Sequence, residues 1–173
     1  SGILEALDLM GAKISLENKI TNDYQEPLAD ITVEYSKLKG VNISSSYSSR
    51  MIDEYPILAI AAAVASGKTK LSGLAELRHK ESDRFKAIIN GLESCGIKVE
   101  SDNDDIIIYG NNKILGGTTI DCNHDHRVAM SFMILGALSL KPIKVIGCKS
   151  ISTSYPTFVS DMNCLGMDIR SND

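Results

Sequence analysis

Apolar residues in the segment 79–96, HKESDRFKAIINGLESCG, recur at helical spacing. They occupy positions i, i+3, i+4 and i+7 of one helix face: Phe85, Ile88, Ile89 and Leu92. Ser82 is the expected N-cap of this helix, and Gly91 is a weak but tolerated position in its interior. We therefore predict an amphipathic helix that begins near Ser82 and ends before Gly96.

Two longer apolar runs, PILAIAAAVA at 56–65 and VAMSFMILGALS at 128–139, have no polar face. Both are too short to span a bilayer, which takes about 20 residues. A helix that is apolar on all sides is normally enclosed by protein. We therefore expect two buried helices, which is unusual for a small domain.

The chain also repeats itself. A helix end, a glycine and a strand are predicted in three places: 7–17, 92–100 and 162–170. The glycines at these places are expected to adopt the left-handed conformation that closes a helix: Gly11, Gly96 and Gly166. A buried helix followed by a turn and a strand recurs at 57–77 and 131–151.

These recurrences predict an α/β (α+β) fold of roughly three pseudo-symmetric β-α-β-α-β-β units, near 1–50, 51–120 and 121–173. The buried helices would lie inside and the sheets outside. The first unit lacks a buried helix and a first strand, so the sequence resembles a piece of a longer chain. No linker-like segment divides residues 1–173, which favours a single domain.

Composition narrows the function classes. The net charge is −4, aromatic residues make up 5%, and there is no basic arm, so nucleic acid is an unlikely partner. The four cysteines form no CxxC pair and indicate a reducing cytosol. The first residues, SGILEALDLMG, lack the features of a signal peptide. We therefore expect a cytoplasmic protein without a membrane partner.

Three segments with candidate chemistry precede predicted helices: 52–56, 77–84 and 125–127. Arg84 and Arg127 fall in first turns, where the helix dipole disfavours a cation by about 0.3–1 kcal/mol. A bound anion would explain both, because helix N-termini and guanidinium groups bind carboxylate and phosphate. Together with Lys80, the two arginines predict a pocket for a small, multiply anionic ligand.

Each residue also has a simpler interpretation. Arg84 could pair with Asp83 or Glu81, and Arg127 with Asp125, as local surface ion pairs.

The two candidate carboxylates also have more than one possible role. Asp53 could cap the helix at 56–66, and Glu81 could be an ion-pair acceptor or a carboxyl tuned for proton transfer. The run DCNHDH at 121–126 contains zinc-ligand types, but they are consecutive and no second cluster completes a site, so no metal is predicted.

Several motifs resemble those of the EPSP synthase (3-phosphoshikimate 1-carboxyvinyltransferase) family. They are, in chain order, IDEYPILAIAAA, ELRHKESDR, DHRVAMSF and TSYPTF, and the resemblance runs from about residue 3 to the C-terminus. The IDEYP, KESDR and TSYP variants are similar to the second bacterial class. The resemblance implies two similar domains, each of three β-α-β-α-β-β units with buried helices, and makes this chain most of the C-terminal domain.

The resemblance also implies a reaction. The family transfers the enolpyruvyl group of phosphoenolpyruvate to the 5-hydroxyl of shikimate 3-phosphate and releases phosphate. This transferase step belongs to the shikimate pathway, which leads to chorismate and the aromatic amino acids. It needs no metal or organic cofactor.

Three residues match the family's proton-transfer and acceptor-binding positions. By motif, Asp53 matches the proton acceptor for the attacking hydroxyl, and Lys80 the lysine that contacts shikimate 3-phosphate. Glu81 matches a carboxylate implicated in proton traffic at the vinyl carbon.

The phosphoenolpyruvate positions are matched in part. Arg84 and Arg127 match the arginines that grip phosphoenolpyruvate, and His126 matches a neighbour of that site. Some members have a lysine where this chain has Thr153 and an asparagine where it has Glu76, so those contacts are not carried over. The N-terminal domain supplies further contacts, so this chain alone is expected to fold but not to turn over.

Two other readings are open. UDP-N-acetylglucosamine enolpyruvyl transferase shares the fold but relies on a loop cysteine, and only Cys122 lies near the motifs, on a predicted strand. A non-catalytic repeat module is the other alternative. In an enzyme, Arg84→Ala and Arg127→Ala should abolish anion binding with little loss of stability, whereas a structural role predicts the reverse.

Overall fold

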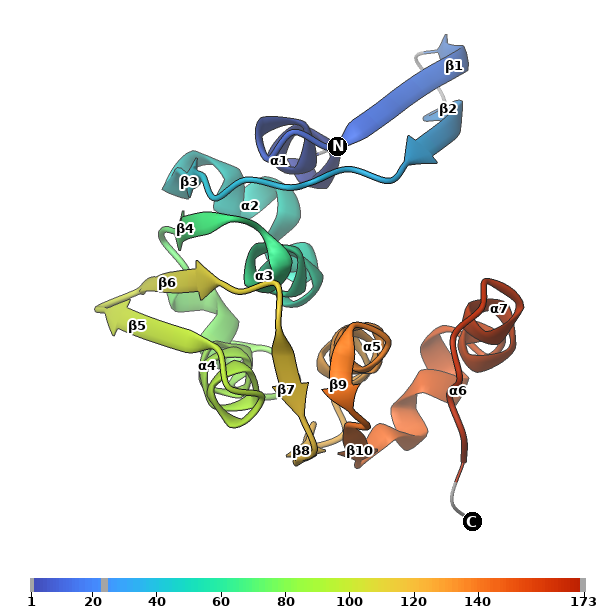
Figure 1. Ribbon diagram of the computed structural model, residues 1–173. Coiled ribbons are helices and arrows are strands. Elements are labelled where there is room, and N and C mark those ends of the chain that lie inside the picture. Colours follow the sequence, from blue (N-terminus) through green and yellow to red (C-terminus); the bar gives the residue numbers. More distant parts are fainter. Residues whose placement is uncertain (1, 23–24, 172–173) are drawn as a thin grey trace.

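The computed structural model describes residues 2–22 and 25–171, in which helices alternate with short strands (Figure 1). The α-helices are α1 (Gly2–Leu9), α2 (Ser48–Met51), α3 (Tyr55–Val64), α4 (Arg84–Ser94), α5 (His126–Gly136), α6 (Ile151–Ser154) and α7 (Phe158–Cys164). The short 3-10 helices are η1 (Ser45–Tyr47), η2 (Ile52–Glu54), η3 (Ala75–His79) and η4 (Cys148–Ser150). No helix in the described ranges is both long and apolar enough to cross a membrane.

The strands form one larger sheet and three pairs. They are β1 (Lys13–Asn22), β2 (Gln25–Glu34), β3 (Asn42–Ile43), β4 (Gly67–Leu71), β5 (Lys98–Asp102), β6 (Asp105–Gly110), β7 (Ile114–Gly116), β8 (Thr119–Asp121), β9 (Ser139–Lys141) and β10 (Lys144–Ile146). The larger sheet has the order β3-β4-β6-β5, in which β3 runs parallel to β4 and the other pairs are antiparallel. The pairs β7-β9 and β8-β10 are parallel, and β1-β2 is an antiparallel hairpin.

The three longest central helices, α3, α4 and α5, pack against one another. The larger sheet covers α3 and α4 through β6 and β5, and the short strands β9 and β10 contact α5 (Figure 1). Helices therefore lie inside and sheets outside, as the sequence predicts for this α/β fold.

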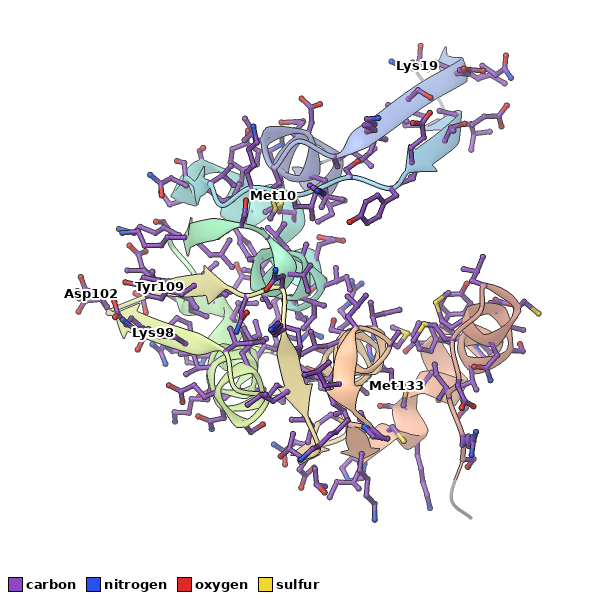
Figure 2. The ribbon with its side chains drawn as sticks, viewed as in Figure 1. Met10, Lys19, Lys98, Asp102, Tyr109 and Met133 are labelled. Carbon is purple, nitrogen blue, oxygen red and sulfur yellow. The ribbon has the colours of Figure 1, made fainter. Side chains whose placement is uncertain are left out.

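The larger sheet shows the alternation expected of one buried and one exposed face. Ile106 and Ile108 of β6 are buried against the helices. On the other face, Lys98 and Tyr109 are paired across β5 and β6, with the Lys98 amine 4.3 Å from the ring centroid (Figure 2). Apolar burial thus fixes which face of the sheet meets the helices.

The two apolar helices differ in how far they are enclosed. Most of α3 is buried, and Ile57 is its only exposed residue. In α5, Met130, Met133 and Ile134 are half-buried, so the prediction of full enclosure is wrong for both helices, since Ile57 of α3 is exposed as well. The physical reason is that α5 contacts α3, α4, α6 and the short strands, which together leave one stripe of it uncovered.

The three predicted closing glycines all have the left-handed backbone, with φ of 85° at Gly11, 83° at Gly96 and 98° at Gly166. A strand follows the first two, β1 and β5 respectively. The third predicted strand is wrong, because no ladder forms between Gly166 and residue 171. Instead, the Asn163 amide bonds both backbone groups of Ile169, at 2.8 and 3.0 Å, and takes the place of a partner strand.

Gly91 is more than a tolerated weak position in α4. A Cβ atom at Gly91 would lie 2.1 Å from a ring carbon of Phe132, a buried residue of α5. The absence of a side chain therefore allows α4 to approach α5 closely, and the sequence interpretation of Gly91 is corrected.

Candidate active site

The structure brings the three candidate segments together. Asp53 lies in η2 just before α3, Arg84 is the first residue of α4, and Arg127 lies in the first turn of α5. Arg84 Nη1 donates to Asp53 Oδ1 at 2.7 Å, and Arg127 Nη1 donates to the Asp53 carbonyl at 3.2 Å. The beginnings of three helices therefore meet at one place, as their positions in the sequence suggest.

The cap of α4 differs from the prediction. Asp83, not Ser82, is the N-cap, and its carboxylate accepts from the Lys86 N–H at 3.0 Å. The Ser82 hydroxyl is engaged elsewhere, because it donates to Asp125 Oδ2 at 3.0 Å. Asp125 is the N-cap of α5: its Oδ1 accepts from the N–H groups of Arg127 and Val128 at 3.0 and 3.3 Å.

The suggestion that Asp53 caps a helix is wrong. Glu54 occupies the N-cap position of α3 and makes no side-chain cap bond, and Pro56 stands in the first turn, where its missing N–H costs nothing. The carboxylate of Asp53 is therefore not used for capping, and it faces Arg84 instead.

Arg84 is the centre of the cluster. Its side chain is 0% exposed, and its three nitrogens each meet a carboxylate. Nε donates to Asp125 Oδ2 at 2.7 Å, Nη1 to Asp53 Oδ1 at 2.7 Å, and Nη2 to Glu81 Oε2 at 2.5 Å. The side chain of Asp125 is also 0% exposed, whereas those of Asp53 and Glu81 are 41% and 53% exposed.

This geometry revises two sequence-based expectations for Arg84. The local-pair alternative names Glu81 correctly, but Asp83 pairs with Lys86 at 3.2 Å instead. The structure changes the expectation for Arg84→Ala: because the substitution would leave the buried Asp125 carboxylate without its counter-ion, we now predict a large loss of stability.

Arg127 and Lys80 are more accessible cations. Arg127 is 37% exposed, and its Nη1 lies 3.8 Å from Glu54 Oε1. The Arg127 guanidinium does not pair with the Asp125 carboxylate; of the Arg127 groups, only the backbone N–H donates to it, so that alternative is wrong. The Lys80 amine lies 3.5 Å from Asp53 Oδ1 and 3.1 Å from Glu76 Oε1.

His126 begins α5 beside Arg127 and is half-buried. The neighbouring backbone is tightly turned, with φ of 47° at Asn123 and 61° at His124. Within residues 2–22 and 25–171, no three His, Cys, Asp or Glu side chains are grouped so that they could hold a metal ion.

The charged groups of the cluster shift the pKa values of their neighbours. Burial acts to raise the pKa of Asp125, but the hydrogen bond and charge of Arg84 outweigh it and hold that pKa below its ordinary value. The pKa of Asp53 is likewise lowered: burial opposes the shift, while the bond from Arg84 and the charges of Arg127 and Lys80 drive it. The bond to Glu76 raises the pKa of Lys80 against the effect of desolvation.

These shifts predict acid sensitivity. The pKa of an aspartate in the unfolded chain is about 3.9, so a lowered folded pKa stabilises the protein above that pH, and the stabilisation is lost as pH falls through the folded value. We expect the free energy of unfolding in urea to fall below about pH 4. Asp125→Asn should show a smaller fall, and equal pH profiles for the two proteins would contradict this assignment.

Sequence reasoning missed one contact within the site and one outside it. The pairing of Asp125 with Arg84 joins residues 41 positions apart, which no local spacing indicates. Arg78 stacks on Phe85 at 3.7 Å and donates to the Asn103 carbonyl at 2.9 Å, which fixes the segment before α4 to the turn between β5 and β6. Arg78 lies seven residues before Phe85 in the sequence, and this spacing alone does not predict the contact.

The comparisons with known proteins agree on one family. The model of the EPSP synthase (3-phosphoshikimate 1-carboxyvinyltransferase) family matches residues 1–162. A 3-phosphoshikimate 1-carboxyvinyltransferase of Paramagnetospirillum magneticum is 44% identical over 174 aligned residues, which cover 100% of this chain and 39% of that protein. This chain therefore spans well under half the length of the curated relatives it matches.

Solved structures show the same fold. The structure of EPSP synthase from Acinetobacter baumannii superposes with a TM-score of 0.94 at 40% identity, covering 100% of this chain and 40% of that one. The enolpyruvyl transferase NikO from Streptomyces tendae, at 21% identity, has a TM-score of 0.73 over 98% of this chain and 36% of its own. The second likeness supports the fold alone.

Proposed function

Because the chain belongs to the EPSP synthase family, we propose that it supplies one half of a site for enolpyruvyl transfer from phosphoenolpyruvate to the 5-hydroxyl of shikimate 3-phosphate. The products are 5-enolpyruvylshikimate 3-phosphate and phosphate, on the route to chorismate and the aromatic amino acids. Residues 1–173 would be most of the C-terminal domain, with repeat units near 1–50, 51–120 and 121–173. The N-terminal domain would be its partner and complete the site.

The observation that carries this proposal is the convergence of Asp53, Lys80, Glu81, Arg84 and Arg127 at the beginnings of α3, α4 and α5. Two guanidinium groups near helix N-termini suit the carboxylate and phosphate of phosphoenolpyruvate. Lys80 would contact shikimate 3-phosphate, and His126 would lie at the edge of the phosphoenolpyruvate site. No covalent nucleophile is required, because charge stabilisation and positioning carry such a reaction.

The proposed chemistry has two steps. In the addition, the 5-hydroxyl oxygen bonds to C2 of phosphoenolpyruvate, Asp53 accepts the hydroxyl proton, and a proton from Glu81 is added to C3. In the elimination, the Glu81 carboxylate takes a proton back from C3, the bond from C2 to the phosphate oxygen breaks, and phosphate leaves with the proton held by Asp53 as the double bond re-forms. Arg84 and Arg127 would hold the negative charge throughout.

The rival transferase is disfavoured by Cys122. Its side chain is fully buried, its sulfur donates to the Ile146 carbonyl at 2.8 Å, and burial raises its pKa to about 11. A thiol of this kind is inert at neutral pH. A non-catalytic module would not need Lys80, Arg127 and two exposed carboxylates at one place.

Phosphate release tests the proposal. We expect no turnover of phosphoenolpyruvate and shikimate 3-phosphate by the 173-residue chain alone. A chimera in which this chain replaces the matching 40% of the Acinetobacter baumannii enzyme should be active, and Asp53→Asn in the chimera should abolish turnover. Asp104→Asn, an exposed carboxylate outside the site, is the matched control. Activity of the isolated chain, or a folded but inactive chimera, would contradict the proposal.

A further inference from the structure

We propose that the three carboxylates around Arg84 have two different roles: Asp125 is a permanent anchor, and Asp53 and Glu81 are occupants that an anionic ligand displaces. The inference rests on the proposed function only for the identity of the ligand. The geometry of the cluster carries the rest.

Asp125 cannot leave Arg84 without a large penalty. Both side chains are 0% exposed, and their contact is 2.7 Å. The same carboxylate accepts from the Ser82 hydroxyl and from the N–H groups of Arg127 and Val128. Its departure would break all of these bonds inside the protein, where unsatisfied polar groups are costly. Asp125 is therefore a positioning residue that fixes one edge of the Arg84 guanidinium and joins the beginnings of α4 and α5.

Asp53 and Glu81 are held much less firmly. Their side chains are 41% and 53% exposed, so water can solvate either carboxylate when it leaves Arg84. Among residues 2–22 and 25–171, Glu81 pairs with Arg84 alone, and Asp53 has Lys80 at 3.5 Å as a second cation. Each of these pairs joins the buried Arg84 guanidinium to a carboxylate that keeps part of its hydration, so breaking it costs less than breaking the fully buried pair with Asp125.

The two occupants stand where a ligand must bind. Asp125 holds Nε, so Nη1 and Nη2 are the nitrogens that a bidentate carboxylate or phosphate could take, and these are the atoms bonded to Asp53 and Glu81. Because the Arg84 side chain is 0% exposed, we infer that an anion reaches these nitrogens by displacing at least one of the two carboxylates.

This exchange has a consequence for the proposed reaction. While Asp53 accepts a bond from Arg84, its pKa lies below the ordinary value, so it is a poorer proton acceptor than a free carboxylate. An anion that binds both Nη1 and Nη2 of Arg84 releases both groups. The residues proposed to move protons therefore lose their bonds to Arg84 when phosphoenolpyruvate binds, and they keep those bonds in its absence.

Binding of inorganic phosphate and of phosphoenolpyruvate to the 173-residue chain, followed by nuclear magnetic resonance titration, tests the inference. Asp53→Asn and Glu81→Gln remove a competing charge, so we expect each to tighten anion binding by about three- to tenfold. Asp125→Asn should weaken binding by a similar factor, because the guanidinium loses its anchor. The control is Asp104→Asn, whose carboxylate pairs with Arg78 outside the site at 3.4 Å and should leave the affinity unchanged.

Weaker or unchanged anion binding in both Asp53→Asn and Glu81→Gln would overturn the inference. So would the absence of saturable binding in the unsubstituted chain and in both variants. The phosphate titration does not depend on turnover, so a failure of the proposed function in the chimera assay remains distinguishable from a failure of this exchange.

Discussion

Arg84→Ala is expected to lower the free energy of unfolding by about 3–5 kcal/mol, the range for breaking a buried ion pair by removing one partner. The substitution leaves the Asp125 carboxylate 0% exposed and without a cation. It also removes the group that holds Asp53 and Glu81 beside the beginning of α4. Urea unfolding followed by circular dichroism measures the loss.

Arg127→Ala is the matched control for this prediction. Arg127 also lies in the first turn of a helix, but it is 37% exposed and its nearest carboxylate is 3.8 Å away, so we expect a change within about 0.5 kcal/mol. Combining Arg84→Ala with Asp125→Asn removes the stranded charge and should recover part of the stability. Equal losses for Arg84→Ala and Arg127→Ala would show that the buried pair is not the source of the effect.

The elements of the fold that follow from local patterns could be predicted from the sequence. The helical spacing from Phe85 to Leu92 marks α4, the apolar run after Pro56 marks α3, and each closing glycine adopts the left-handed conformation. These features depend on the chemistry of neighbouring residues, which periodicity reports directly.

The positions of the site segments were also predictable, but their pairing was not. Helix N-termini identify Arg84 and Arg127 as candidate anion ligands, and the structure places them around Asp53. Which carboxylate each arginine meets depends on how α4 and α5 are aligned. That alignment is set by tertiary packing, and no spacing within one helix contains it.

The same alignment explains two findings in α4 that differ from the sequence-based expectations, one at Arg84 and one at Gly91. The contact between Arg84 and Asp125 and the contact between Gly91 and Phe132 each join α4 to α5 across 41 residues. Two turns of α4 thus meet two turns of α5 in a fixed register. The buried ion pair lies at the beginning of this contact, and the missing side chain of Gly91 allows the helices to stay close further along.

Gly91→Ala is accordingly expected to destabilise the protein, although alanine favours helix by about 1 kcal/mol over glycine. The added Cβ would lie 2.1 Å from one ring carbon of Phe132 and 2.7 Å from two others. The Phe132 ring is 1% exposed, so either the ring or the two helices must shift within a packed core, and such overpacking costs about 1–3 kcal/mol or more. At so short a distance we expect the upper part of that range, which leaves a net loss of about 2 kcal/mol in urea unfolding.

Gly136→Ala provides the comparison, because Gly136 is the last residue of α5 and a Cβ there would meet only Ile143, at 3.8 Å. With ordinary contact and no steric conflict, the helix preference of alanine decides, and we expect a gain of no more than about 1 kcal/mol. Pairing Gly91→Ala with Phe132→Leu should cost less than the sum of the two single changes, since the smaller side chain makes room for the methyl group. A stabilising effect of Gly91→Ala alone would mean that α4 and α5 can move apart freely. In that case the register that aligns Arg84 with Asp125 would not be fixed by this contact.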